Sequence, residues 1–271
     1  MASTSALRIA VLLPDLLGTY GDRGNATVLA QRMRWRGYPA EVIHVASDVP
    51  IPGSCDVYLL GGGEDVAQVE ATRLLDGSGF ADAAARGAVV LAVCAGLQIL
   101  GRFSVDSTGQ LHGGLGLLDL TTRPLPHRAV GEILTAPTGG IGLGTEPLTG
   151  FENHRGATTL GPSAAPLATV NRGVGNGDGG EGVVSGHVVG TYLHGPVLAR
   201  NPALADYLLN MATGLALDSL PLADIDDLRS SRLSAQDRHD SRLSKLRTAL
   251  TPRRWTAPGV PAQSRRGGGS S

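Results

Sequence analysis

The segment Ala88–Gly101 constrains the fold more than any other part of the sequence. Val89–Val93 is an apolar run rich in β-branched residues, which predicts a strand buried on both faces of a parallel sheet. Cys94 follows between small neighbours, and a helical pattern begins directly after it. This order is typical of a nucleophile elbow, a strained turn that exposes a reactive side chain at the carboxyl edge of a sheet. The helix N-terminus should favour the thiolate of Cys94. The alternative is a small, buried core cysteine.

The first hundred residues alternate between apolar runs and helical patterns, which predicts an α/β fold with a doubly wound, mostly parallel sheet. Active sites in such sheets lie at the carboxyl ends of the strands. We expect strands at 7–13, 40–45, 56–60 and 89–93, and helices at 26–36 and 66–86, the second with a break at 77–79.

Two glycine-containing loops follow predicted strands. The loop 15–25 matches neither a P-loop nor the dinucleotide-binding glycine pattern, so we interpret it as a structural turn or a surface facing a partner. The loop Gly61–Gly63 is either a tight turn or one half of an oxyanion hole. In the second case the N–H of Gly62 or Gly63 would act together with the N–H of Ala95, because glycine lets a substrate approach the main chain.

The pattern changes after Gly101, where short strand candidates predict an antiparallel addition to the parallel sheet. A glycine-rich stretch at 173–182 is expected to be a mobile surface loop, and a helix is expected at 197–212. The short strands are expected at 117–122, 130–136, 151–154, 168–170 and 183–189, with a loop between the first two.

His194 is the second candidate for chemistry, because a predicted strand delivers it to the Gly195-Pro196 turn. A lone histidine is more often a structural hydrogen-bonding residue than a base. Here, however, a strand end about a hundred residues after Cys94 suits a Cys–His pair that the fold assembles.

Composition excludes several classes of protein. The formal net charge is −1, which gives no sign of a nucleic-acid or membrane surface, and no apolar run reaches the ~18 residues of a membrane span. The two cysteines make no disulfide framework, and Cys55 is most simply a packed thiol. We therefore expect a cytoplasmic protein with one domain over residues 7–220. Residues 221–271 are expected to form a helical, then disordered, extension.

Five motifs together resemble one branch of the class I glutamine amidotransferases, which have a flavodoxin-like fold and are close to the glutaminase parts of cobyric acid synthases. Within that branch the chain is similar to the GatD-type glutaminase subunits of lipid II isoglutaminyl synthases. The motifs are Thr19–Asn25, Gly61–Asp65, the Cys94 elbow, Phe151–Arg155 and Tyr192–Pro196.

The resemblance implies that this chain hydrolyses glutamine with Cys94 as nucleophile and His194 as proton shuttle, and that Arg128 binds the substrate. It also implies a partner, a MurT-like Mur ligase subunit, that uses the ammonia to amidate the D-glutamate α-carboxyl of lipid II. This chain would need no cofactor or metal, and ATP and magnesium would bind to the partner. The alternatives are a cobyrinate- or cobyrate-type glutaminase and a non-enzymatic flavodoxin-like protein with a cysteine elbow.

The sequence departs from the wider class at one position. Many class I members carry a glutamate two residues after the histidine, but Pro196 stands there in this chain. The acid that orients His194 must therefore come from elsewhere. Glu152 is one internal candidate, and our sequence-based hypothesis is a carboxylate of the partner ligase.

Overall fold

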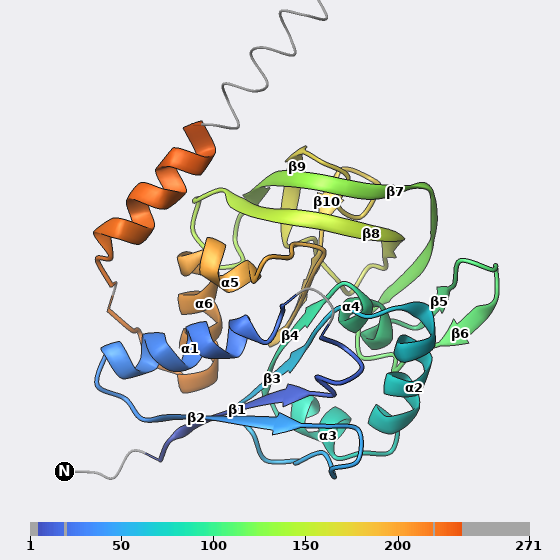
Figure 1. The fold of residues 1–271 in the computed structure, drawn as a ribbon, viewed down its shortest axis with the longest axis horizontal. Coiled ribbons are helices and arrows are strands. Elements are labelled where there is room, and N and C mark those ends of the chain that lie inside the picture. Colours follow the sequence, from blue (N-terminus) through green and yellow to red (C-terminus); the bar gives the residue numbers. More distant parts are fainter. Residues whose placement is uncertain (1–4, 19–20, 219, 235–271) are drawn as a thin grey trace, which may run out of the picture. The chain divides into compact units, whose positions relative to one another are not determined.

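A six-stranded sheet with the order β11-β12-β4-β3-β1-β2 organises the unit Met1–Leu220 in this computed structural model (Figure 1). The strands from β12 to β2 are parallel, and β11 pairs antiparallel with β12. The structure describes residues 5–18, 21–218 and 220–234. The strands of this sheet are β1 (Leu7–Leu12), β2 (Ala40–Val45), β3 (Val57–Leu60), β4 (Val89–Val93), β11 (Val183–Ser185) and β12 (Val188–Thr191).

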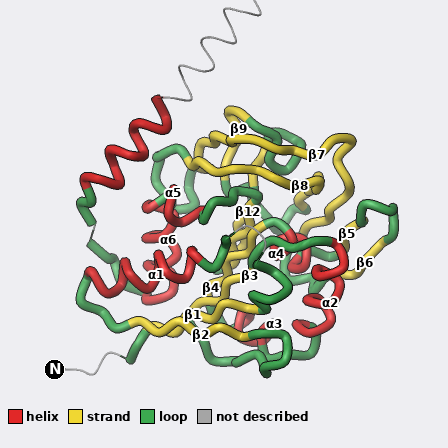
Figure 2. Tube along the Cα trace, viewed as in Figure 1, coloured by secondary structure: helices red, strands yellow, loops and turns green. Residues whose placement is uncertain are grey.

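Helices flank this sheet in two groups, as a doubly wound topology requires (Figure 2). In one group α1 contacts both α5 and α6, and in the other α4 contacts α2 and packs on β4. The sequence analysis placed all four strands of the first hundred residues and the break between α2 and α3 correctly. The helices are α1 (Gly24–Trp35), α2 (Asp65–Leu75), α3 (Phe80–Ala85), α4 (Ala95–Leu100), α5 (Val197–Arg200) and α6 (Pro202–Thr213).

The core of this unit lies on both faces of the parallel sheet. Every residue of β3, β4 and β12 is buried, which explains why these strands are continuous apolar runs rather than alternating ones. Cys55 is a buried, free thiol beside this core, as its sequence context indicates.

A second sheet carries the predicted antiparallel addition. Its order is β10-β9-β7-β5-β6, with β8 also paired to β7, and all of its pairs are antiparallel except β5 with β7. The strands are β5 (Phe103–Val105), β6 (Leu111–Gly113), β7 (Leu120–Pro137), β8 (Leu148–Leu160), β9 (Ala168–Arg172) and β10 (Gly180–Glu181).

The two strands expected at 117–122 and 130–136 are in fact one long strand, β7. Its pairing with β8 shifts register between Pro124 and Ala129. Proline cannot donate to a strand ladder, so Pro124 and Pro126 lie where the regular pairing lapses. The prolines mark an irregularity within a strand and not a loop between two strands.

Two other elements were predicted as single and are split in the structure. The strand expected at 183–189 is the hairpin of β11 and β12, which turns at Gly186-His187. The helix expected at 197–212 is divided into α5 and α6 at Asn201, whose side-chain nitrogen donates to the backbone oxygens of Val197 and Thr149. The following Pro202 disfavours a helical conformation at Asn201.

The stretch 173–182 is not only a surface loop. Glu181 is fully buried and accepts hydrogen bonds from the Thr191 hydroxyl at 2.5 Å and from the Tyr192 N–H at 2.9 Å. Asn176 is also buried, and its side chain bonds to the Gly182 backbone at both nitrogen and oxygen. The glycines allow the tight turns, while these two polar side chains attach the stretch to β12 and to its own backbone.

The second unit, Pro221–Ser271, is described only as far as residue 234, and residues 223–234 are helical. The disordered tail expected from the sequence lies outside the described residues. Over the described part of the chain, no helix combines the length and the apolar character needed to span a membrane.

Burial raises the pKa of Glu181 to about 7, above the ordinary value of 4.5. The folded chain therefore holds a proton there that the unfolded chain releases between pH 4.5 and 7, and its stability should fall as pH rises through this window. We expect Glu181→Gln to gain stability relative to the wild type by up to about 3 kcal/mol across the window, as measured by urea unfolding at several pH values.

Glu41→Gln is the matched control, because Glu41 is exposed. Its unfolding at the same pH values serves as the reference for replacing one exposed glutamate. Equal pH slopes for Glu181→Gln and the wild type would show that Glu181 is ionised in the folded protein.

Candidate active site

The carboxyl ends of four neighbouring strands meet at one edge of the parallel sheet. The loops after β1, β3, β4 and β12 bring Asp22, Gly61–Gly63, Cys94 and His194 to this edge. Thr191 is in register with Val93, and the Cys94 N–H donates to the Thr191 oxygen at 2.9 Å. The pairing of β12 with β4 therefore places the segment of His194 next to that of Cys94.

Cys94 has the strained backbone of a nucleophile elbow. Its φ of 54° and ψ of −106° lie outside the regions that L-residues usually adopt. The close turn needs glycine at position 96, because a Cβ there would lie 2.8 Å from Leu60 Cβ and 3.0 Å from the Leu60 oxygen. The strand–Cys–helix geometry is thus the one that the sequence pattern predicts, with β4 before Cys94 and α4 after it.

The protonation of Cys94 differs from the prediction. Cys94 is only 7% exposed, and burial raises the pKa of its thiol to about 12, with the charge of Asp22 acting in the same direction. The Ala95 N–H and the charge of Arg128 lower this pKa, but by less. The predicted helix effect is present, but it is too weak to offset desolvation, so the thiol is protonated at neutral pH.

His194 is held by main-chain hydrogen bonds on both sides of its own backbone. Its N–H donates to the Phe151 oxygen at 2.9 Å, and its oxygen accepts from the Phe151 N–H at 3.1 Å. This bridge joins the end of the parallel sheet to β8 of the second sheet. The imidazole is 2% exposed, and its Nδ1 lies 3.7 Å from Oδ1 of Asp22.

The three oxyanion candidates have different surroundings. The Gly62 N–H donates to Oδ2 of Asp22 at 2.9 Å, so it is engaged by a carboxylate in this structure. Gly63 lines the cavity that contains Cys94. The Ala95 N–H lies beside the Cys94 sulfur, where it lowers the thiol pKa. Ala95 and Gly63 are therefore better placed than Gly62 to meet a negative oxygen.

The described residues of the loop 15–25 make close contacts with both neighbouring loops. A Cβ at Gly24 would lie 2.3 Å from Pro196 Cγ, and one at Gly61 would lie 2.1 Å from the Leu17 oxygen. Asn25 accepts a hydrogen bond from the Leu198 N–H at 3.0 Å. These contacts fit the structural turn that was one of the two interpretations from the sequence, and the loop also carries Asp22, which the sequence analysis did not single out. Asp22 follows the first strand of a doubly wound sheet, and this position is the signal by which the sequence could have identified it as a candidate site residue.

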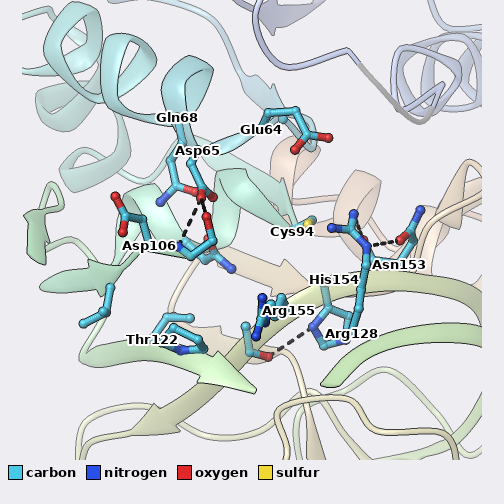
Figure 3. Close-up of a pocket in the computed structure, with 16 residues that line it drawn as sticks. Glu64, Asp65, Gln68, Cys94, Asp106, Thr122, Arg128, Asn153, His154 and Arg155 are labelled. Carbon is cyan, nitrogen blue, oxygen red and sulfur yellow. Dashed lines mark hydrogen bonds between the residues drawn. The ribbon is translucent and has the colours of Figure 1, made fainter. Parts of the chain in front are cut away.

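A cavity of about 170 Å³ opens in front of Cys94, between the parallel sheet and the second sheet (Figure 3). In this view Asp65 and Asp106 lie on one side of Cys94, Arg128 and Asn153 lie on the other, and Glu64 lies above it. Amide side chains, together with these charged ones, give the cavity a polar lining. The residues with charged or amide side chains are Glu64, Asp65, Gln68, Gln98, Asp106, Arg128, Asn153 and Arg155.

Arg128 lines this cavity and is held in place by β8. Its Nε donates to Oδ1 of Asn153 at 2.6 Å, an interaction drawn in Figure 3. The guanidinium belongs to an exposed part of β7, yet it is close enough to lower the pKa of Cys94. Asn153 was not predicted as a site residue, although it lies within the conspicuous motif Phe151–Arg155.

Glu152 lies in a separate buried group behind the cavity. It accepts hydrogen bonds from the N–H groups of Val174 and Gly175, and its Oε2 lies 3.6 Å from His154 Nε2. His154 in turn stacks on Tyr192 with ring centroids 3.9 Å apart. Glu152 thus supports the wall of the cavity. Within residues 5–18, 21–218 and 220–234, no group of three or more His, Cys, Asp or Glu side chains could hold a metal ion.

Comparisons with known proteins agree with this geometry. Residues 8–202 match the model of the CobB/CobQ-like glutamine amidotransferase domain. The chain is 35% identical to the lipid II isoglutaminyl synthase (glutamine-hydrolyzing) subunit GatD of Staphylococcus aureus over 212 residues, 76% of this chain and 84% of that protein. It is 34% identical to the GatD subunit of Streptococcus pneumoniae over 219 residues, 76% of this chain and 80% of that protein.

Two further comparisons agree with this family and fold. A cobyric acid synthase of Sphingopyxis alaskensis is 35% identical over 180 residues, which are 62% of this chain but only 34% of that protein. A crystal structure of a glutamine amidotransferase superposes with a TM-score of 0.52 at 20% identity, covering 76% of this chain and 98% of that one. The structural likeness supports a class I amidotransferase fold.

Because burial raises its pKa to about 12, the Cys94 thiol should react slowly with iodoacetamide at neutral pH. We expect the alkylation rate to rise about tenfold per pH unit between pH 7 and 10, as the thiolate fraction rises. Mass spectrometry of the Cys94 peptide measures this rate. The Cys55→Ser variant removes the second thiol and should give the same profile. A rate that is already at its plateau at pH 7 would show a resting thiolate.

Proposed function

The chain belongs to the CobB/CobQ-like glutamine amidotransferase family, and we propose that it is the glutamine-hydrolysing subunit of a lipid II isoglutaminyl synthase. One observation carries the reaction class: Cys94 lies on a strained elbow between strand and helix, at the sheet edge that also holds the buried His194. The GatD relatives, each matched over at least 80% of its length, support the specific assignment.

The cavity suits a small zwitterion with a polar side chain. Arg128 presents a guanidinium fork to one end of it, which suits the α-carboxylate of glutamine. The acidic side chains of Asp65 and Asp106 line the opposite side and would attract the α-ammonium group. The side-chain amide of the substrate would then lie at Cys94.

Hydrolysis then follows two steps. His194 takes the thiol proton of Cys94 as sulfur attacks the amide carbon, and the N–H groups of Ala95 and Gly63 stabilise the resulting oxyanion. Collapse of this intermediate breaks the C–N bond, and the proton on His194 leaves with the nitrogen as ammonia. Water then hydrolyses the thioester to glutamate and restores the thiol. The thiol is protonated at rest, so its activation depends on His194.

Ammonia is useful only to an acceptor that has been activated elsewhere. We propose a MurT-like Mur ligase subunit as the partner, with ATP and magnesium on that subunit and none on this chain. The partner would activate the D-glutamate α-carboxyl of lipid II, and ammonia would convert it to the amide of D-isoglutamine. The proposed location is the cytoplasm.

The decisive experiment uses the complex of this chain with its candidate ligase. The wild-type complex should hydrolyse glutamine and amidate lipid II when ATP is present. Cys94→Ser should abolish both glutamine-dependent activities, while ammonium chloride restores amidation, because only the ammonia source is lost. Absence of glutamine hydrolysis by the wild-type complex would overturn the enzyme assignment. Amidation of a cobyrinate in place of lipid II would assign the acceptor to the cobyric acid synthase class.

Arg128→Ala should weaken the capture of glutamine by about 1.5–3 kcal/mol, because a charge-assisted hydrogen bond to the carboxylate is lost. This corresponds to a fall in kcat/KM of roughly 10- to 150-fold, mainly through a higher KM. Steady-state glutaminase kinetics of the complex measure the change. Arg123→Ala is the matched control, since Arg123 is an exposed arginine on the same strand that lies over the Phe103 ring. An unchanged kcat/KM in Arg128→Ala would remove Arg128 from the site.

A further inference from the structure

We infer that Asn153 is a positioning residue that holds the Arg128 guanidinium in place for a substrate carboxylate, and that this pair makes the site selective for amides with an α-carboxylate. The inference rests on the proposed glutaminase function and assigns a role within the same site. Arg128 lies on β7 and Asn153 on β8, and both line the cavity in front of Cys94. The antiparallel pairing of β7 with β8 brings the two residues together.

Asn153 makes two contacts with Arg128. Its Oδ1 accepts a hydrogen bond from Arg128 Nε at 2.6 Å, and its backbone oxygen accepts a longer one from Nη2 at 3.4 Å. Both nitrogens belong to the same planar group, so the two bonds together restrain the plane and the direction of the guanidinium. The register shift of β7 between Pro124 and Ala129 includes Arg128. The contacts with β8 therefore restrain a side chain that lies in an irregular stretch of its own strand.

Neighbouring side chains on β8 hold Asn153 in turn. Glu152 accepts backbone hydrogen bonds from the stretch 173–182, and the His154 ring stacks on Tyr192 with centroids 3.9 Å apart. Both neighbours are buried, whereas Asn153 lines the cavity, because side chains alternate between the two faces of a strand. The acceptor that Asn153 offers to the guanidinium is therefore carried by a strand that is anchored on its other face.

The chemistry of the acceptor is as important as its position. An aspartate at this place would also accept the Nε–H of Arg128, but its charge would neutralise the guanidinium that has to attract the substrate. The amide oxygen of Asn153 is a neutral acceptor. Asn153 therefore restrains the direction of the guanidinium and leaves its positive charge intact.

The direction given to the guanidinium fits the proposed position of the substrate. In the view of Figure 3 the guanidinium of Arg128 lies between Asn153 and Cys94. Asn153 takes the edge of the group that carries Nε, so a carboxylate bound at its terminal end would lie on the side of Cys94. A cation that is already restrained loses less conformational freedom when the substrate binds, which favours amides that carry a carboxylate at this point.

The test measures the glutaminase kinetics of the complex with two amides, L-glutamine and 4-aminobutanamide, which is glutamine without its α-carboxylate. Asn153→Ala should lower kcat/KM for L-glutamine by about 10- to 100-fold, mainly through a higher KM, because the guanidinium loses its direction. Its kcat/KM for 4-aminobutanamide should stay within about twofold of the wild type, since this amide has no carboxylate for Arg128 to bind.

Asn153→Asp separates this role from a merely structural one. Aspartate keeps the shape of the side chain and the acceptor for Arg128, so a structural role predicts a milder effect than that of alanine. The inference predicts instead that kcat/KM for L-glutamine falls at least as far as in Asn153→Ala, because the new charge neutralises the guanidinium. Asn171→Ala is the matched control, since Asn171 is an exposed asparagine on β9 of the same sheet, and it should leave both amides at wild-type values.

The inference is overturned if Asn153→Asp keeps the wild-type kcat/KM for L-glutamine, or if the variants lose activity equally toward both amides. Calorimetry on the complex with Cys94→Ser measures binding without turnover, and there L-glutamine should bind at least about 10-fold more tightly than 4-aminobutanamide. Equal affinities for the two amides also overturn the inference, even if the Asn153 variants do not fold.

The binding experiment separates this inference from the glutaminase assignment. If the wild-type complex hydrolyses no glutamine, the proposed reaction fails. A preference for L-glutamine in binding that Asn153→Ala reduces would still support the role of Asn153. If the wild-type complex hydrolyses glutamine and Asn153→Ala leaves the preference unchanged, the reaction stands and the inference about Asn153 is wrong.

Discussion

The parallel pairing of β4 with β12 is the interaction on which the site depends. The ladder continues one residue past β4, where the Cys94 N–H donates to Thr191, and it thereby fixes the elbow relative to the segment that carries His194. No short sequence motif could supply this proximity, since a hundred residues separate the two side chains. The excursion between β4 and β12 includes the whole second sheet, which returns to the site through the bridge between Phe151 and His194. Both sheets therefore contact the short segment that contains Thr191 and His194.

The burial of Cys94 has two opposite effects on its reactivity. The thiol of Cys94 lies where water cannot compete for an oxyanion, but the same desolvation raises its pKa, and the buried charge of Asp22 adds to this. A resting thiolate would need a fixed cation at the sulfur. The structure instead provides a neutral thiol and a histidine, an arrangement in which the nucleophile forms during the attack. The charge of Asp22 opposes a thiolate at Cys94, and its Oδ1 lies 3.7 Å from Nδ1 of His194.

Much of the parallel half could be predicted from the sequence, because buried strands such as Val89–Val93 are continuous apolar runs and their order follows from the βαβ pattern. The sequence predicted that the second sheet is mainly antiparallel, but not the bounds of all its strands. Proline within β7 suggested a loop, and Asn201 within a helical pattern gave no sign of a break. Asp22 and Asn153 were missed for a different reason: each acts through a contact with a residue distant in sequence, Gly62 or Arg128, that only the folded chain reveals.

The second sheet is better understood as part of the active site than as an addition to the fold. β7 contributes Arg128, and β8 contributes the Asn153 that accepts its hydrogen bond, so the basic side of the cavity belongs to this sheet. Cys94, the proposed nucleophile, follows β4 of the other sheet. In the proposed reaction a substrate would contact both sheets, and the Phe151–His194 bridge joins the two sheets beside the cavity. The register shift in β7 lies between Pro124 and Ala129 and so includes Arg128, while the ladder with β8 is regular on either side.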